Sequence, residues 1–349
     1  MLKPKRILIV GNFGRKNLYR RYFNTESKLA NGFIRGGHHV LSFSDRDHAR
    51  EATIWGTQKA GRRKLASQLI EVAAHYKPHM ILFGHVDLLP NTIFQEIRKA
   101  APGVKLAALC VDALFREATI ARFVARANEM DAAFVTTGDR ELLKQLNLPD
   151  NLLYFLPNPV DESMETERVF DVPRRELAFD GQFLGTGIDK REAQLDAIRA
   201  GLPKDYRFHC AGRAYQSNRI DSTEFLIKLA DGAVCPNLPL DDLNAEQLHK
   251  LYSSDRIAQT LGQGVTTLTI NACKLSELYE DGVVEYEDRD SLVEHMLELF
   301  HDDEKRRKIG ARGHAIAHSR TNATRVSNYI LSRTLGEGNP EIFWDGTAV

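Results

Sequence analysis

"SSDRIAQTLGQGVTTLTINACKLSELYEDGVVEYED", residues 253–288, alternates two helical segments with two short strands. The pattern predicts helices over 253–264 and 274–282 and strands over 265–270 and 283–288. Short strands separated by helices are typical of a parallel sheet that helices cover on both faces. This part of the chain therefore predicts an α/β fold.

The same alternation extends over the rest of the chain. In the N-terminal half, strands are predicted over 6–10, 39–44, 79–83, 105–111, 131–136 and 152–156, with helices over 25–37, 62–76, 115–130 and 139–146. In the C-terminal half, further strands are predicted over 177–183, 206–212 and 232–237, with helices over 190–201, 222–230, 291–300 and 303–333. We interpret the chain as two doubly wound, Rossmann-like parallel-sheet domains.

A stretch rich in prolines and charges separates the two halves. Residues 156–176 contain three prolines and are interpreted as an interdomain linker. The expected domains are 1–157 and 158–312. The last part of the chain, about 313–349, is expected to pack back on the first domain through an apolar stripe on its helix.

The composition is that of an ordinary globular protein with room for two domains. The chain has 349 residues, of which 43% are hydrophobic and 27% are charged. It contains neither an apolar run of the length that spans a membrane nor a signal-peptide pattern at its start. Its four cysteines lie far apart, so we expect buried thiols in a reducing cytoplasm. They are Cys110, Cys210, Cys235 and Cys273.

Charge is unevenly distributed although the net charge is zero. Residues 1–160 hold 24 Lys and Arg against 14 Asp and Glu, a net charge of +10, and the remainder carries −10. A basic half suits an anionic partner or peripheral contact with an anionic membrane surface at its inner face. An unevenly charged, solvated surface is the alternative. We expect no nucleic acid as a partner.

Residues 252–313 resemble the donor-binding region of group 1-like glycosyltransferases of the GT-B fold. The resemblance is carried by Arg256, Gly264, Glu277–Tyr279, Asp281 with Gly282, Glu285, and Arg306 with Arg307 ahead of Gly310. Residues 177–198 and 31–44 resemble further segments of that family. One departure is Gln259, which stands where the family usually has a ribose-binding Glu.

The resemblance implies two Rossmann-like domains facing a cleft, with acceptor binding in the N-terminal domain and donor binding in the C-terminal domain. The implied activity is metal-independent transfer of a sugar from a nucleotide-sugar to a glycan or lipid-linked acceptor, in bacterial surface polysaccharide or glycoconjugate synthesis. No cofactor is expected beyond the nucleotide-sugar, which is a substrate.

Candidate donor-binding residues follow the strands of the second half, where a leaving diphosphate needs cations and backbone N–H groups. They are Gly185, Thr186, Gly187, Lys190, Arg191, Arg213, Ser254, Arg256, Gln259 and Glu277. The alternative for Lys190 and Arg191 is a pair of solvated charges at a helix start.

Candidate catalytic residues follow the strands of the first half, because ligands of open α/β sheets lie beyond the carboxyl ends of the strands. A general base for an acceptor hydroxyl is expected among Asp45, Asp47, His85 and Asp112. The alternative for each is a helix-capping or turn residue.

Two weaker patterns resemble the motifs of other kinds of site, but neither predicts one. The loop "GNFG", 11–14, is not the GxGxxG of a dinucleotide site. The triplet "DRD", 45–47, matches a D-x-D metal motif, but the same pattern recurs at 288–290, so no metal site is predicted.

Three other functions remain open. They are a sugar-nucleotide epimerase of the same fold, a non-catalytic scaffold subunit in which Gln259 marks a decayed donor site, and a nicotinamide oxidoreductase.

Overall fold

A computed structural model describes residues 3–15, 18–20, 22–53, 60–115, 117–149, 151–185, 189–212, 220, 222–239 and 248–344. The chain divides into two compact units, of which unit 1 is Met1–Pro159 with Ala323–Val349 and unit 2 is Val160–Asn322. Among the described residues, no helix combines the length and the apolar character needed to cross a membrane.

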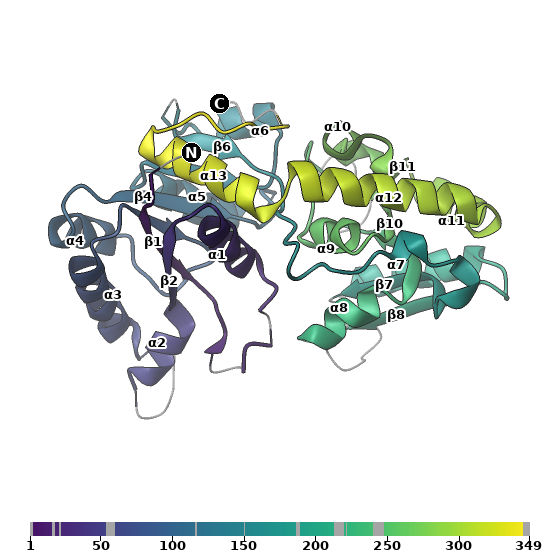
Figure 1. Ribbon diagram of the computed structural model, residues 1–349, viewed down its shortest axis with the longest axis horizontal. Helices are drawn as coiled ribbons and strands as arrows, with labels where there is room; N and C mark the ends of the chain where they lie inside the picture. The colour runs from purple at the N-terminus through teal and green to yellow at the C-terminus, as the bar shows by residue number, and fades with distance from the viewer. Residues whose placement is uncertain are drawn as a thin grey trace. The chain divides into compact units, whose positions relative to one another are not determined.

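Unit 1 is built on a six-stranded parallel sheet in the order β2-β1-β3-β4-β5-β6 (Figure 1). Its strands are β1 Arg6–Gly11, β2 His39–Ser44, β3 Met80–Phe83, β4 Lys105–Cys110, β5 Ala132–Val135 and β6 Leu153–Phe155. Its helices are α1 Thr25–Arg35, α2 Asp45–Glu51, α3 Arg62–Tyr76, α4 Ile93–Ala100, α5 Glu117–Ala127, α6 Arg140–Gln145 and α13 Ala323–Leu335. All six strands predicted in this half are present.

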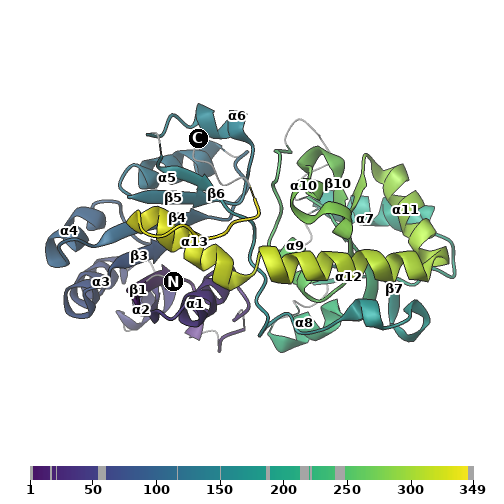
Figure 2. The same cartoon turned by 45° about the horizontal axis from the view of Figure 1, so that its top comes forward.

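Unit 2 is built on a five-stranded parallel sheet in the order β11-β10-β9-β7-β8, of which β7 and β10 are labelled in Figure 2. Its strands are β7 Phe179–Gly185, β8 Phe208–Gly212, β9 Gly232–Asn237, β10 Thr266–Ile270 and β11 Val284–Tyr286. Its helices are α7 Asp189–Gly201, α8 Thr223–Leu229, α9 Arg256–Gly262, α10 Ser276–Tyr279, α11 Arg289–His301 and α12 Asp303–Arg320. Two doubly wound parallel sheets confirm the predicted fold class.

Apart from the exposed Arg6 at the start of β1, the central strands β1 and β3 are buried, which explains why they are nearly continuous apolar runs. The side chains of Ile7–Val10 in β1 and of Met80–Phe83 in β3 are fully buried. On one face of the sheet, Phe83 packs edge-on against Phe94 of α4, with ring centroids 5.0 Å apart. Burial on both faces is the arrangement expected for a parallel sheet covered by helices.

The C-terminal helical region differs from the prediction of one long helix. It breaks at Thr321 and Asn322, so that α12 belongs to unit 2 and α13 to unit 1. Within unit 1, α13 packs along α1. A Cβ on Gly32 would lie 2.2 Å from the Ala323 carbonyl oxygen, and the Ser327 hydroxyl donates to the Leu29 carbonyl at 3.0 Å. The absence of a side chain at position 32 therefore allows the two helices to touch.

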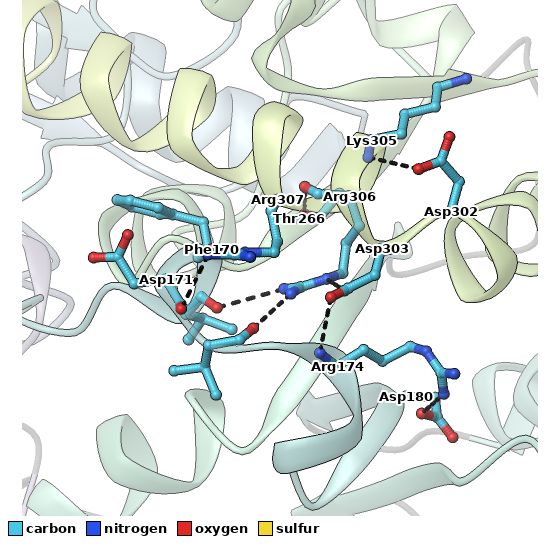
Figure 3. A network of polar contacts seen from close by, with 12 residues as sticks. Phe170, Asp171, Arg174, Asp180, Thr266, Asp302, Asp303, Lys305, Arg306 and Arg307 are labelled. Carbon is cyan, nitrogen blue, oxygen red and sulfur yellow. Dashed lines mark hydrogen bonds and ion pairs between the residues drawn. The ribbon is translucent and has the colours of Figure 1, made fainter.

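The predicted linker is not a free connection, because from Val160 onward it packs on unit 2. Arg306 of α12 is fully buried, and its guanidinium donates to the Val172 carbonyl and to Asp303, both at 2.6 Å (Figure 3). The neighbouring Arg307 donates to the Phe170 carbonyl at 2.7 Å. The arginine pair of the family-like motif thus fixes the entry of the chain into unit 2.

Candidate active site

Each sheet has one point where the strand order reverses, between β1 and β3 in unit 1 and between β7 and β9 in unit 2. At such a point the loops that leave the carboxyl ends of the strands diverge, and ligands of doubly wound sheets bind there. We call the carboxyl ends of the two strands at these points the β1–β3 edge and the β7–β9 edge. The described candidate residues are compared by how close they lie to these strand ends.

At the β7–β9 edge, Arg256 stacks on Phe183 with its guanidinium carbon 4.4 Å from the ring centroid. The side chain is buried, and it donates to the Leu184 carbonyl at 3.2 Å and to the Asn237 side-chain oxygen at 3.3 Å. Within the described part of the chain, Arg256 has no carboxylate partner. A buried cation that meets only neutral oxygens retains a strong attraction for an anion.

A second buried cation lies beside the first. Arg191, in the first turn of α7, has its guanidinium carbon 5.4 Å from the same Phe183 ring. It is 3% exposed and donates to the Pro239 carbonyl, which follows β9, at 2.7 Å. It is therefore not a solvated charge at a helix start. Two guanidinium groups on one phenyl ring place positive charge at the end of β7.

Polar groups line a small cavity next to this pair. The cavity has a volume of about 30 Å³, room for one or a few waters, and Arg191 and Asn237 contribute to its wall. Ser254 donates its hydroxyl to Asn237 at 3.4 Å. The hydroxyl of Thr269 is fully buried there and meets no hydrogen-bond partner among the described residues.

The remaining donor candidates differ in their positions. Gly185 ends β7, and a Cβ there would lie 2.6 Å from an Arg256 guanidinium nitrogen, so the missing side chain lets the arginine approach. Gln259 is buried, and its amide donates to Asp255 at 3.4 Å. Glu277 instead forms a half-exposed ion pair with Lys250 at 2.8 Å. Thr186, Gly187, Arg213 and the side chain of Lys190 lie outside the described residues.

At the β1–β3 edge, His85 lies between two carboxylates. Its Nε2 is 2.8 Å from Asp87 and its Nδ1 is 3.5 Å from Asp112. The hydrogen bond with Asp112 raises the pKa of His85 above its usual value, and the charge of Asp87 adds to this effect. The arrangement resembles a base oriented by a carboxylate, which is suited to proton transfer.

The carboxylate of Glu26 is buried at the ends of β1 and β3, beside the loop that follows β1. Glu26, in the first turn of α1, accepts a hydrogen bond from the His85 backbone N–H at 3.1 Å. A Cβ on Gly11 or Gly84 would lie within 2.8 Å of the Glu26 side chain, so this carboxylate occupies the space at the ends of β1 and β3. A negative charge there opposes phosphate binding. The geometry gives no support to a dinucleotide site in this loop.

Asp45 and Asp47 differ in their hydrogen-bond partners. Asp45 is fully buried, and burial raises the pKa of its carboxyl to about 7. One oxygen accepts from the Arg46 backbone N–H at 2.6 Å, and the other has no partner among the described residues. Asp47 accepts from the Arg15 backbone N–H at 2.7 Å and from Ser44, so it fixes the loop after β1.

His85, Asp87 and Asp112 line a pocket of unit 1 that has a volume of about 290 Å³. The lining also includes Arg122 and Arg126 of α5. Across the described ranges, no three His, Cys, Asp or Glu side chains are grouped as they would be around a metal ion.

Solved structures of similar architecture cover nearly the whole chain. Sucrose-phosphate synthase from Thermosynechococcus elongatus has a TM-score of 0.66 at 12% identity, with 95% of this chain and 99% of that chain covered. HepE from Anabaena, in complex with UDP and glucose, has a TM-score of 0.61 at 13% identity, with coverage of 94% and 98%. A putative UDP-N-acetylglucosamine 2-epimerase from Listeria monocytogenes has a TM-score of 0.53 at 12% identity, with coverage of 98% and 99%. At these identities the likeness establishes the fold.

The class of enzyme comes from the sequence of unit 2. Residues 190–332 match the model of a family described as glycosyl transferase-like, and the match includes Arg191 and Arg256. The chain has the GT-B fold, and its residues 190–332 are glycosyl transferase-like in sequence. This match confirms the resemblance to group 1-like glycosyltransferases of the GT-B fold that the sequence indicated. No curated protein sequence matches this chain significantly.

Several side chains at the two edges were missed by sequence reasoning. They are Glu26, Arg122 and Arg126 in unit 1 and Phe183 and Asn237 in unit 2. An acidic residue directly after a glycine-containing loop was an available signal for Glu26. The arginines of α5 look like a solvated helix face in the sequence, so only the structure reveals the pocket beside them.

Proposed function

We propose that this glycosyltransferase moves a sugar from a uridine diphosphate sugar to a glycan or lipid-linked acceptor, in the synthesis of a bacterial surface polysaccharide or glycoconjugate. The pair of buried guanidinium groups on Phe183 is the observation that carries the donor half of the proposal. HepE was solved with UDP and with UDP-glucose, so uridine nucleotides are the first donors to test.

Arg256 would stabilise the leaving group. When the anomeric C–O bond of the donor breaks, its electron pair leaves with the nucleoside diphosphate, and negative charge develops there. Because the described partners of Arg256 are neutral oxygens, its positive charge is not already neutralised by them. Fixed cations can replace a divalent metal in this role, and we therefore propose a metal-independent reaction, which excess EDTA should leave unchanged.

His85 would receive the proton of the acceptor. The acceptor oxygen forms a bond to the anomeric carbon while its O–H bond breaks, and the proton passes to the imidazole. Nε2 takes this proton once the acceptor hydroxyl has replaced Asp87 as its hydrogen-bond partner, while Asp112 holds Nδ1, and the two carboxylates stabilise the imidazolium that forms. Asp45 lies deeper and Asp47 is engaged with the loop after β1, so neither is our choice for the base.

The test is thermal unfolding of the full chain with UDP, GDP, CMP, ADP, dTDP and NAD. A nucleotide at 100 times its dissociation constant should stabilise the protein by about 2.7 kcal/mol. We expect UDP to stabilise the wild type. Arg256→Met, which keeps the apolar contact with Phe183 but removes the charge, should lose most of that shift. The control is Arg289→Met, because Arg289 is a half-exposed arginine of the same unit.

The other outcomes separate the alternatives. Stabilisation by no nucleotide would favour the scaffold reading that Gln259 left open. Stabilisation by NAD alone would contradict the donor proposal. Conversion of a bound UDP-sugar into its epimer without any acceptor would favour the epimerase, whose fold is shared.

We further propose peripheral contact of unit 1 with an anionic membrane, where a lipid-linked acceptor would reside. Leu18 and Tyr19 are 77% and 53% exposed, and Arg20 beside them is exposed as well. Apolar tips among cations suit an anionic lipid surface. Leu18→Ser with Tyr19→Ser should reduce binding to phosphatidylserine vesicles, as should neutralising the exposed residues 62–64. Ile227→Ser, an exposed apolar residue of unit 2, is the control. Unchanged vesicle binding in both sets would contradict membrane contact.

A further inference from the structure

The pocket beside His85 has a cationic wall that proton transfer alone does not require. Arg122 and Arg126 lie four residues apart on α5, so both side chains project from the same face of that helix. Both line the pocket of about 290 Å³. This volume is at the lower end of the range for small-molecule sites, which corresponds to a ligand of roughly monosaccharide size.

Arg126 is the deeper of the two cations, and its charge is not matched. Its guanidinium donates to the Val86 carbonyl at 2.9 Å and to the Leu89 carbonyl at 3.4 Å. Its Nε is buried and meets no acceptor among the described residues, none of which forms an ion pair with it. Burial lowers the pKa of Arg126, because the charged guanidinium has lost water. Both an open donor and an unmatched charge are suited to an anionic ligand group.

Arg122 stands at the rim of the same pocket. Its side chain is 62% exposed, and its nearest described carboxylate oxygen, on Asp87, is 3.4 Å away. Asp87 is also held by His85 at 2.8 Å and lies 3.9 Å from Arg46, so Arg122 does not hold it alone. Arg122 Nε donates to the Ala118 carbonyl at 3.3 Å, which leaves Nη2 to turn toward a ligand. Two guanidinium groups on successive turns form a fork that fits a phosphate or a carboxylate.

The rest of the pocket lining, which we call the facing wall, has different chemistry. Asp112 and His85 offer a carboxylate and an imidazole at the ends of β4 and β3, and Asn91 adds an amide. Such groups hydrogen-bond hydroxyls. A ligand that satisfies both walls has an anionic group at one end and hydroxyls at the other.

We propose that this pocket binds the acceptor through an anionic monosaccharide unit, a sugar that carries a phosphate or a carboxylate. The anionic group lies against Arg122 and Arg126, and a hydroxyl of the sugar is directed to His85. The word acceptor rests on the proposed function, whereas the binding of an anionic sugar is independent of it.

The test is calorimetric titration of the full chain, without nucleotide, against glucose 6-phosphate, glucuronic acid, glucose and inorganic phosphate. We expect at least one of the two anionic sugars to bind about tenfold or more tightly than glucose, as a charge-assisted hydrogen bond requires. The first two ligands distinguish a phosphate from a carboxylate as the preferred group. Inorganic phosphate should bind more weakly, because it lacks the hydroxyls that the facing wall recognises.

Variants locate the site. Arg122→Gln, at an exposed rim position that tolerates change, should weaken the anionic sugar about tenfold and leave glucose unaffected. Arg126→Gln should weaken it further, and Arg126→Lys should restore part of the loss. Arg289→Gln, which alters an arginine of similar exposure in unit 2, is the control.

Four results would overturn the proposal. They are equal affinity for glucose and both anionic sugars, equal affinity for inorganic phosphate, retention of affinity in both the Arg122 and the Arg126 variants, or binding of none of the probes. Stabilisation by UDP is measured separately through Arg256 in unit 2. A chain that binds UDP but no anionic sugar therefore contradicts this inference alone, and the reverse result contradicts the donor proposal alone.

Discussion

His85 Nδ1 lies 3.5 Å from a carboxylate oxygen of Asp112, and this contact is the main reason why the pKa of His85 is raised. The two residues come from different strand ends, so the contact depends on β3 and β4 being neighbours in the sheet. A base whose pKa is raised is protonated over more of the acidic range, which makes activity sensitive to pH below neutrality.

Asp112→Asn should move the acidic limb of the kcat/KM profile to lower pH. The neutral amide no longer stabilises the imidazolium, so the pKa of His85 falls. The profile is measured with the donor identified by the nucleotide panel. Glu117→Gln, an exposed carboxylate at the start of α5, should leave the limb in place. A limb that stays fixed or rises in Asp112→Asn would show that this pair does not set it.

Asp45→Asn should change how stability depends on pH. The pKa of Asp45 is about 7 in the folded chain, against 3.8 for an unperturbed carboxyl, so between these values the folded state holds the proton that the unfolded state has lost. The contribution of this group to the free energy of unfolding therefore falls as pH rises through that window, by about 1.4 kcal/mol per unit. The variant lacks this loss.

Urea unfolding at pH 4, 5.5, 7 and 8 measures the effect. The stability of Asp45→Asn relative to wild type should rise by a few kcal/mol between pH 4 and pH 7 and then level off. Glu141→Gln, whose parent side chain is 80% exposed, should show no such trend. Parallel profiles for wild type and Asp45→Asn would mean that the buried carboxyl is not protonated near neutrality.

Strands could be predicted from the sequence because a strand buried on both faces is a short apolar run, as in 6–10 and 79–83. Helix α2 was missed for the opposite reason. Its sequence, DRDHARE, has no apolar period, and the helix is defined by contacts that the sequence does not display, such as Asp47 with the Arg15 backbone. A helix is recognised in a sequence by the regular spacing of the apolar residues that it buries against a sheet. Because α2 is mostly polar, its sequence lacks this spacing.

The candidate site was predicted in part, and there is a physical reason why some of its residues were predicted and others were missed. His85 and Arg256 follow strand ends or start helices, positions at which the chain order itself indicates the functional edge. Arg126 lies at the end of a helix and acquires its significance only because the 84–91 loop folds over it. A pairing between segments 40 residues apart leaves no local pattern in the sequence.

Gly185→Ala should weaken UDP binding without unfolding unit 2. The new Cβ would lie 2.6 Å from an Arg256 guanidinium nitrogen, which is the end of a flexible side chain and can be displaced. We expect a stability change below about 1 kcal/mol and a clear loss of the UDP-induced thermal shift. Gly201→Ala, whose Cβ would meet Val293 methyl groups at 3.2 Å, is the matched control. An unchanged UDP shift in Gly185→Ala would argue against a role for the Arg256 position in donor binding.

Arg306→Leu should destabilise unit 2 selectively. The fully buried guanidinium is paired with Asp303 and holds the carbonyl of Val172, and its removal takes the paired cation from the carboxylate, which keeps only the Arg174 backbone N–H, and takes this donor from the carbonyl (Figure 3). Breaking a buried pair in this way costs about 3–5 kcal/mol. Lys308→Gln, at a 75% exposed position two residues further along α12, should stay within about 0.5 kcal/mol of wild type.

The two units can be followed separately in one urea titration. Trp344 is buried against Tyr329 of α13 in unit 1, so its fluorescence reports that unit, whereas far-ultraviolet circular dichroism reports both units. In Arg306→Leu, the dichroism should acquire an earlier transition at lower urea while the fluorescence midpoint stays near that of wild type. If the fluorescence midpoint falls by the same amount, the two units unfold together. The segment around Val172 that Arg306 holds would then stabilise the whole chain rather than unit 2 alone.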